Sequence, residues 1–462
     1  MSLWTASEIA TAVHGEASAD FAVTGVTFDS REVGPGDLFV ALTGEATDGH
    51  RFLAGAYANG AGGAIVSTPG AGPAVVVADT MAALEDLGRA ARARTAATII
   101  GITGSVGKTG TKEALAAALD RAAPGRTHWS VKSYNNHTGV PLSLARMPAA
   151  TRFGVFEMGM NHAGELTALT GMVRPHIAIV TAIAPAHTAF FSGEEAIADA
   201  KGEIFQGLEP GGTAIIPFDS PHRDRLIAAA RPHAARIVTF GLGEGADVRA
   251  LDTVSVNNGG GSFVCARVGA RELSFTVSQP GAHWVSNALA VLAAVDAAGG
   301  DLGLAGLALA DMGGLPGRGQ RFLTSVGGGD ALVIDESYNA NPSSMRATLA
   351  VLAATPGRRI AVLGGMRELG ADSGDYHAAL AGPIDEAGIS RAILVGAEMA
   401  PLAAALEGRV DFVHVADAAA AREALRAMLA AGDAVLIKGS NGIGLSAVVA
   451  ALADSGMAGV AD

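Results

Sequence analysis

The segment TGSVGKT at residues 103–109 constrains the fold of this chain more than any other feature. It follows ATIIGIT, a short apolar run rich in β-branched residues, and precedes TKEALAAALDRAA, which has helical spacing and stops at Pro124-Gly125. A glycine-rich loop between a buried strand and a helix N-terminus presents consecutive backbone N–H groups to a phosphate. The pattern predicts a nucleotide site where Lys108 neutralises the β- and γ-phosphates, Thr109 ligates Mg²⁺, and the cradle is formed by Gly104, Ser105, Val106 and Gly107.

One position departs from the general phosphate-loop pattern, which places a glycine five residues before Gly107, where this chain has Ile102. Gly104 supplies an inner glycine instead, and the strand–loop–helix context still favours nucleotide binding over a surface turn. Glu157 ends a second apolar run, VFEMG, so we expect its carboxylate at the carboxyl edge of the same sheet. Mg²⁺ prefers hard oxygen ligands, and Glu157 is therefore a predicted metal ligand.

The chain is long enough for about three domains, and its hydrophobic pattern changes along its length. Residues 1–95 mix short strands, turns and helices, which predicts a small α/β domain. Residues 96–313 alternate buried strands with helices, which indicates a central P-loop domain with a parallel sheet. Within it, TVSVNNG, GSFVCARV and ELSFTVS predict a small antiparallel insert. Residues 314–462 return to strand–helix alternation, so we expect a C-terminal Rossmann-like α/β domain.

Composition excludes several classes of partner. Acidic residues outnumber basic ones, 45 to 32, and the formal net charge is −13, so we expect neither nucleic acid nor an anionic membrane surface as a partner. No apolar stretch approaches the roughly 20 residues that span a bilayer, and no signal-peptide pattern is present, which predicts a cytoplasmic protein without stable membrane insertion. The single cysteine, Cys265, cannot form an internal disulfide and is predicted to be a partly buried apolar residue.

A series of ordered motifs runs along the chain: TGSVGKT, YNNHTGVPLSL, VFEMGMNHAGEL, IAPAH, AKGEIF, PGRGQR and DESYNANPSSM. Together they resemble the Mur ligase family, ATP-dependent amide-forming ligases that build the peptide of peptidoglycan precursors. The segment DSREVGPGDLFVALTGEATDGHRFL resembles the family's uridine-nucleotide-binding domain. GGMRELGADS and LIKGSNG resemble the ligase that acts last in the series. The resemblance implies UDP-N-acetylmuramoyl-tripeptide and D-alanyl-D-alanine as substrates, ATP and two Mg²⁺ ions as cofactors, and a monomeric enzyme.

The resemblance also implies roles for individual residues. Lys108, His187 and Lys201 are the expected catalytic residues. Thr109 and Glu157 would ligate one Mg²⁺, while His187 and Lys201 would serve the second. Lys201 is expected as an N6-carboxylated lysine, because carboxylation converts an ammonium of pKa about 10.4 into an anionic oxygen ligand. The remaining expected contacts are Asn136 beside the metal site, Asn287 at adenine, Arg318 at the γ-phosphate, Asp335 and Asn339 on the ribose side, and Ser30 and Arg31 at the uridine nucleotide.

Two loops depart from the family pattern. Thr188 and Ala189 follow His187, where the family has a bulky apolar residue and then an acidic one. Gly365 stands where the family has an acidic residue, which weakens any catalytic role for its loop.

Three alternative functions are weighed against this interpretation. The preceding ligase of the series, which adds the third peptide residue, carries a DNPR-type element, whereas this chain has NPSS at residues 341–344. A folate polyglutamylating ligase shares the central ATPase but lacks the N-terminal DSR…DGH domain. A regulatory P-loop ATPase, from a different class, would hydrolyse ATP slowly without a small-molecule acceptor, and it leaves the Lys201 motif unexplained.

Overall fold

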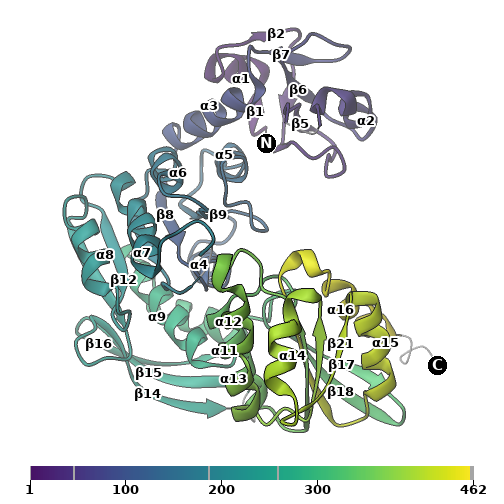
Figure 1. Ribbon diagram of the computed structural model, residues 1–462. Helices are drawn as coiled ribbons and strands as arrows, with labels where there is room; N and C mark the ends of the chain where they lie inside the picture. The colour runs from purple at the N-terminus through teal and green to yellow at the C-terminus, as the bar shows by residue number, and fades with distance from the viewer. Residues whose placement is uncertain (1, 45–46, 186–187, 257–259, 458–462) are drawn as a thin grey trace.

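Three β-sheets of five, nine and six strands, each built from a consecutive part of the chain, organise the computed structural model. The structure describes residues 2–44, 47–185, 188–256 and 260–457. Figure 1 shows three bodies, with the N-terminal domain above the central domain and the C-terminal domain beside the central one. The predicted three-domain α/β fold class is confirmed. Among the described residues, no helix is both long and apolar enough to cross a membrane.

The N-terminal domain has a five-stranded sheet in the order β2-β7-β6-β5-β4, parallel except for β2, with a separate β1–β3 pair. Apolar side chains from α1 and α3 pack on one face of this sheet. Its elements are β1 (Trp4–Thr5), α1 (Ala6–Ala12), β2 (Glu16–Ala17), β3 (Ala22–Val23), β4 (Gly25–Thr27), β5 (Asp37–Val40), η1 (Gly49–Phe52), α2 (Leu53–Ala58), β6 (Gly63–Val66), β7 (Ala74–Val76) and α3 (Thr80–Ala93).

The central domain is built on a nine-stranded sheet in the order β16-β15-β14-β13-β12-β11-β8-β10-β9. The strands from β9 to β14 are parallel, and the predicted antiparallel strands β14, β15 and β16 extend the same sheet at one edge. Alternate residues of β8 face opposite sides: Ile100 and Ile102 pack with α4 and α9, whereas Ile99 packs on the other face with α5 and α6. Burial on both faces explains why these strands are continuous apolar runs.

The central elements are β8 (Thr98–Thr103), α4 (Lys108–Ala122), β9 (Thr127–Trp129), α5 (Gly139–Ala145), β10 (Phe153–Glu157), α6 (Glu165–Val173), β11 (Ile177–Val180), α7 (Glu194–Gly202), η2 (Glu203–Gly207), β12 (Thr213–Pro217), α8 (Arg223–Ala230), β13 (Arg236–Gly241), β14 (Val248–Val256), β15 (Gly261–Val268), β16 (Arg271–Val277), α9 (Ala282–Ala297) and α10 (Leu302–Asp311).

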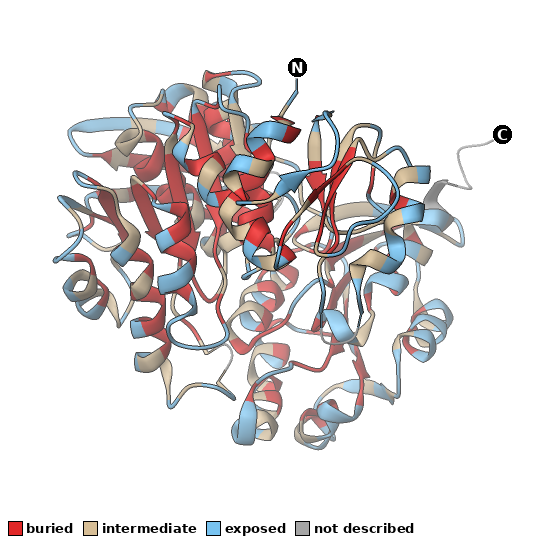
Figure 2. Ribbon diagram, turned by 90° about the horizontal axis from the view of Figure 1, so that it is seen from above, coloured by how far each residue is buried: buried red, intermediate tan, exposed pale blue. Residues whose placement is uncertain are grey.

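The C-terminal domain has a six-stranded sheet in the order β17-β18-β22-β19-β20-β21, parallel except for the edge strand β17. Helices cover both faces of this sheet. Over the molecule as a whole, Figure 2 shows buried residues gathered on strands and on the inner sides of helices, with exposed residues on the outer sides. The NPSS element begins α11: the Asn341 side chain accepts a hydrogen bond from the Ser344 backbone N–H (2.8 Å), and Pro342 is the first helical residue.

The C-terminal elements are β17 (Gln320–Val326), β18 (Gly329–Glu336), α11 (Pro342–Ala353), β19 (Arg358–Gly364), η4 (Gly370–Asp372), α12 (Ser373–Ala378), α13 (Ala381–Glu386), β20 (Arg391–Val395), η5 (Ala397–Met399), α14 (Ala400–Leu406), β21 (Asp411–Val415), α15 (Ala418–Met428), β22 (Asp433–Lys438), η6 (Asn441–Ile443) and α16 (Ser446–Met457).

Buried polar contacts fasten the N-terminal domain to the central one. The Trp4 indole N–H donates to the carbonyl of Ala145 (2.8 Å), at the end of α5. The Arg94 guanidinium stacks 3.3 Å from the Trp4 ring and donates to the carbonyls of Leu3 (3.0 Å) and Met147 (3.3 Å). These contacts orient the N-terminal domain relative to the central sheet.

Candidate active site

The phosphate loop joins the end of β8 to the start of α4. Gly104 and Gly107 have positive φ angles of 149° and 85°, which favour glycine. A Cβ atom at Gly104 would lie only 2.0 Å from the hydroxyl oxygen of Thr181, which follows β11. That hydroxyl donates to the carbonyl of Val106 (2.6 Å), so the neighbouring strand fixes the loop. Because α4 begins at Lys108, its unpaired N–H groups and the positive end of its dipole face this loop.

Lys108 folds back over the loop. Its Nζ donates a hydrogen bond to the carbonyl of Gly104 (2.6 Å). Burial lowers the pKa of Lys108, the Glu157 carboxylate opposes this shift, and the Arg318 cation adds to it. Charges from the loop, from β10 and from the linker before β17 are therefore close enough to influence one another.

Thr109 and Glu157 place two oxygen atoms that could ligate a metal beside the loop. Thr109 Oγ1 donates to Glu157 Oε2 (2.8 Å), and Asn135 Nδ2 donates to Glu157 Oε1 (2.7 Å). Both Thr109 and Glu157 are almost fully buried. In the described part of the chain, no cluster of three or more His, Cys, Asp or Glu side chains could hold a metal alone. A hydroxyl and a carboxylate next to a phosphate cradle nevertheless fit Mg²⁺, which commonly takes its remaining ligands from phosphates and water.

Lys201 lies in α7 and is 1% exposed. Burial, and after it the charge of Lys108, hold the pKa of Lys201 well below its usual range. A lowered pKa favours the neutral amine, which is the form that can react with CO₂. His187, predicted to serve the same metal ion, lies outside the described residues.

Two predicted nucleotide contacts differ in their surroundings. Asn287, in α9, lies against the phosphate loop, since a Cβ atom at Gly107 would be 2.7 Å from Asn287 Oδ1. Asn136 is exposed, and its Oδ1 accepts a hydrogen bond from the backbone N–H of Gly139 (2.9 Å) at the start of α5. Its neighbour Asn135 is the residue that contacts Glu157. The motif YNN contained this residue, but adjacent asparagines are not distinguished by pattern alone.

Arg318 links the C-terminal domain to the P-loop domain. Its Nη2 donates to the hydroxyl of Ser133 (3.1 Å), and its guanidinium lies 4.1 Å from the centre of the Tyr338 ring. These two contacts orient the guanidinium from opposite domains.

Asp335 is buried and holds the linker that carries Arg318. One carboxylate oxygen accepts from the backbone N–H of Gly317 (2.6 Å), and the other accepts from the backbone N–H (3.0 Å) and hydroxyl (2.7 Å) of Ser337. Asn339 is exposed. A cavity of about 650 Å³ lies next to Asp335, and its lining includes Gly317, Gln320, Phe322, Ser337, Tyr338 and Asn441.

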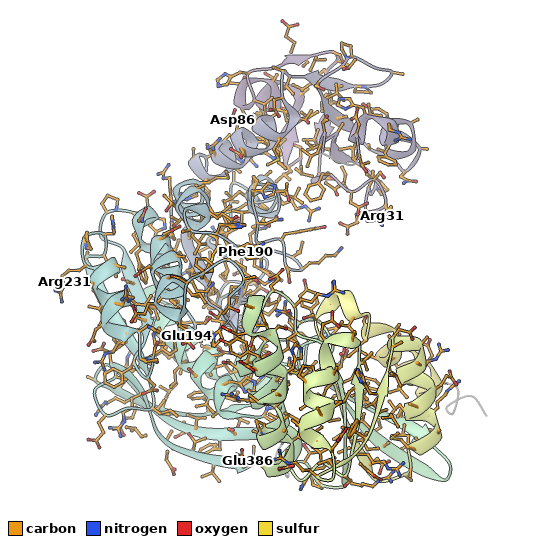
Figure 3. The ribbon with its side chains drawn as sticks, viewed as in Figure 1. Arg31, Asp86, Phe190, Glu194, Arg231 and Glu386 are labelled. Carbon is orange, nitrogen blue, oxygen red and sulfur yellow. The ribbon has the colours of Figure 1, made fainter. Side chains whose placement is uncertain are left out.

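The predicted uridine-nucleotide residues follow β4. Arg31 is exposed and pairs with Asp29 (2.6 Å), which lowers the pKa of Asp29 to about 2, chiefly through that hydrogen bond. Ser30 is partly buried, and its carbonyl accepts from the side chain of Asn59 (3.2 Å). Figure 3 shows Arg31 on the underside of the N-terminal domain, on the side where the other two domains lie.

One of the two departures from the family pattern lies at a contact between the central and C-terminal domains, and the other lies within the C-terminal domain. Thr188 Oγ1 donates to the carbonyl of Leu369 (3.0 Å), and the Ala189 backbone N–H donates to the carbonyl of Glu368 (3.1 Å). The loop after His187 is thus held against the loop after β19. At Gly365, a Cβ atom would lie 3.1 Å from Glu398 Cβ and 3.3 Å from its Oε2, so a carboxylate from η5, which follows β20, occupies part of this space.

The sequence interpretation missed an ion pair between a buried lysine and a partly buried glutamate. Glu336 and Lys438 end β18 and β22 in register, with Lys438 Nζ 3.4 Å from Glu336 Oε2. Burial raises the pKa of Glu336 and lowers the pKa of Lys438, while the attraction between the two groups opposes both shifts. The sequence shows opposite charges at the ends of two apolar runs, but this pattern predicts an ion pair only once the two strands are known to be neighbours.

Comparisons with known proteins match these domains. The model of the Mur ligase middle domain matches residues 102–295, that of the Mur ligase glutamate ligase domain matches 317–441, and that of the Mur ligase family catalytic domain matches 22–118. A UDP-N-acetylmuramoyl-tripeptide–D-alanyl-D-alanine ligase of Escherichia coli K12 is 34% identical over 98% of this chain and 99% of its own. The chain belongs to the Mur ligase family. A ligase of the same name from Synechocystis is 35% identical over 94% of this chain and 93% of its own.

Solved Mur ligase structures share the fold. MurF from Acinetobacter baumannii superposes with a TM-score of 0.84 at 32% identity, covering 98% of this chain and 99% of that one. MurF from Thermotoga maritima, solved in complex with ADP, superposes with a TM-score of 0.77 at 25% identity. The match covers 94% of this chain and 98% of that one. This Mur ligase thus has the three domains in the same arrangement.

Proposed function

We propose that this chain joins UDP-N-acetylmuramoyl-tripeptide to D-alanyl-D-alanine through an amide bond, with cleavage of ATP to ADP and phosphate. The observation that carries the proposal is the convergence of Lys108, Glu157 and Arg318 on one phosphate loop, with the Arg31 loop of the N-terminal domain on the same side. Relatives named for this reaction match almost the whole chain, which supports this ligase over the one that adds the third residue.

The chemistry requires that a carboxylate oxygen become part of a good leaving group. The terminal carboxylate of the tripeptide attacks the γ-phosphorus of ATP in line, the bond to the β–γ bridging oxygen breaks, and ADP leaves. The amino group of D-alanyl-D-alanine then attacks the acyl phosphate at its carbonyl carbon. Phosphate departs with the former carboxylate oxygen, and the amine loses a proton. No side-chain nucleophile takes part, so catalysis consists of positioning and charge stabilisation.

The residues of the loop perform that stabilisation. Lys108 and the backbone N–H groups of 104–109 hold the β- and γ-phosphates, and Arg318 faces the γ-phosphate from the C-terminal side. Mg²⁺, held by Thr109 and Glu157, neutralises phosphate charge when bound. Asn136 lines this site.

Lys201 and His187 are proposed to serve a second Mg²⁺. The neutral amine of Lys201 attacks CO₂, an N–C bond forms, and a proton is released, which leaves an anionic carbamate on the Nζ atom. Burial of Lys201 supports this modification because it disfavours the competing ammonium form.

The remaining assignments concern the two nucleotides. Asn287 contacts adenine, Asn339 and the Asp335 segment form the ribose side, and Ser30 with Arg31 binds the uridine nucleotide. The proposal includes a monomeric enzyme of the cytoplasm.

The test is ADP release by the purified chain with ATP, Mg²⁺ and UDP-N-acetylmuramoyl-tripeptide. We expect D-alanyl-D-alanine to support turnover, and free D-alanine, lysine and diaminopimelate to fail. Turnover of a UDP-muramoyl-dipeptide with lysine or diaminopimelate would instead identify the preceding ligase. Slow ADP release that is insensitive to every amine would identify a regulatory ATPase.

A further inference from the structure

Lysine is used sparingly in this chain. The sequence has five lysines against 27 arginines. Each of the five lies in or beside the elements of the candidate site: Lys108, Lys112, Lys132, Lys201 and Lys438. Arginine supplies the rest of the formal positive charge, including Arg31 and Arg318 of the site, so the five lysines mark the positions with a compact ammonium in place of a planar guanidinium. Lys112 has no part in the chemistry proposed above.

Lys112 is a fully buried cation one turn along α4 from Lys108, with 0% of its surface exposed. Its Nζ donates to the carbonyls of Ser130 (2.6 Å) and Lys132 (2.8 Å) and lies 2.9 Å from Glu113 Oε1. An ammonium has three donors, and these three acceptors match that number. The same Nζ is 4.0 Å from Glu157 Oε2, the carboxylate predicted to ligate Mg²⁺.

The carbonyls that Lys112 holds belong to a segment, residues 130–135, that touches the N-terminal domain. We call it the junction segment. Lys132 has a positive φ of 54°, an unfavourable conformation for a residue with a side chain, and Lys112 holds its carbonyl. The Lys132 ammonium pairs with Glu32, and the Tyr134 hydroxyl donates to the same carboxylate (3.2 Å). Glu32 directly follows Arg31, a predicted uridine-nucleotide residue.

The junction segment also touches the other two parts of the site. The Ser133 hydroxyl accepts a hydrogen bond from Arg318, and Asn135 orients Glu157. Successive residues of one short segment therefore contact all three domains, and one buried cation fastens that segment to the helix of the phosphate loop.

We propose that Lys112 is a positioning residue that anchors the junction segment, and through it fixes the Glu157 carboxylate, the Arg318 guanidinium and the loop of the uridine-nucleotide domain. This inference rests on the proposed ligation for its catalytic consequence. Its structural consequence is that Lys112 controls Mg²⁺ affinity without touching the metal, because it holds the segment whose Asn135 side chain orients Glu157.

The test compares Lys112→Met, which keeps the stem and removes the ammonium, with Lys112→Arg. Calorimetry measures Mg²⁺ binding to the chain saturated with a non-hydrolysable ATP analogue, and steady-state assays measure kcat. Outer partners of metal ligands typically change metal affinity by about 10- to 100-fold, so we expect Lys112→Met to weaken Mg²⁺ binding at least about 10-fold. Lys112→Arg is also expected to weaken Mg²⁺ binding, because the planar guanidinium does not match the geometry of the three acceptors. Arg121→Met, on the same helix with an exposed partner, Asp311, is the control and should bind Mg²⁺ normally.

Asn135→Ala keeps the inference falsifiable if Lys112→Met does not fold. It removes one hydrogen bond to Glu157 from a partly exposed residue and should weaken Mg²⁺ binding in the same direction. The double variant, with Lys112→Met and Asn135→Ala, should lose less Mg²⁺-binding free energy than the two single variants together, because both substitutions act on one carboxylate. Unchanged Mg²⁺ affinity in folded Lys112→Met, or full additivity, would overturn the inference. Absence of ligation by the unmodified chain would instead refute the proposed function, while the Mg²⁺ measurement would still decide the role of Lys112.

Discussion

Replacing Asp335 tests how the C-terminal domain presents Arg318 to the phosphate loop. The carboxylate is 4% exposed and accepts three hydrogen bonds, two of them from backbone N–H groups of Gly317 and Ser337. Each hydrogen bond to a charged group contributes about 1.5–3 kcal/mol, and water entering the site would recover part of this. We therefore expect Asp335→Ala to lower the free energy of unfolding by about 4 kcal/mol. Asp335→Asn keeps one acceptor oxygen but turns an NH₂ group toward a donor, so we expect it to lower the free energy of unfolding by about 2 kcal/mol.

The assay for Asp335 combines scanning calorimetry with steady-state kinetics. For a domain of this size, about 4 kcal/mol corresponds to a fall in Tm of about 10 °C in the transition of the C-terminal domain. Because the linker carries Arg318, a displacement of about 1 Å would lower kcat by about 100-fold. Asp330→Ala, an exposed position on the same strand, is the control and should change neither quantity. If Asp335→Ala lowered the free energy of unfolding by less than about 1 kcal/mol and left kcat normal, the reasoning would be refuted.

Three further predictions follow from the site and its surroundings. Lys108→Ala should abolish ligation at saturating ATP and leave Tm unchanged, because it removes charge compensation of the phosphates; near-normal ligation would contradict the phosphate-loop assignment. Lys201→Arg should be inactive while Lys201→Glu retains a trace, since the proposed carbamate is an anion; an active Lys201→Arg would show that a simple cation suffices. Burial, above all, lowers the pKa of His128 and of His283 to about 4. The unfolded chain takes up these protons below about 6.5 and the folded chain only near 4, so stability falls as pH decreases through this window, by up to about 3 kcal/mol for each histidine. Urea unfolding between pH 7 and 4.5 should show a smaller loss for His128→Asn than for the unmodified chain, and an equal loss would contradict the assignment.

The parts of the fold that could be predicted from the sequence are those that short, local sequence patterns specify. The phosphate loop needs only a strand, two glycines and a helix start, which are adjacent in the chain. Strands of a sheet covered on both faces are continuous apolar runs, so the alternation of the central and C-terminal domains was recognisable. The antiparallel strands were also recognisable from their alternating pattern.

Contacts between distant segments were not predictable in the same way. Asn135 and Asn136 are adjacent, yet Asn135 donates to Glu157 whereas Asn136 accepts from the backbone N–H of Gly139 at the start of α5. The Glu336–Lys438 pair depends on β18 lying beside β22, which are about one hundred residues apart in sequence. Glu398, in η5 after the neighbouring strand β20, lies against Gly365, which sequence spacing does not reveal. These contacts depend on strand order and on how loops pack against the sheets, and both follow from packing of the whole domain.

The central claim is that ATP cleavage and amide formation proceed through one acyl phosphate, and oxygen tracing tests it most directly. The tripeptide substrate is labelled with ¹⁸O in its terminal carboxylate and ligated to D-alanyl-D-alanine with unlabelled ATP. The account predicts one ¹⁸O atom in each molecule of released phosphate and none in ADP, because the attacking carboxylate oxygen leaves with the phosphoryl group. Unlabelled phosphate, or label recovered in AMP, would contradict it.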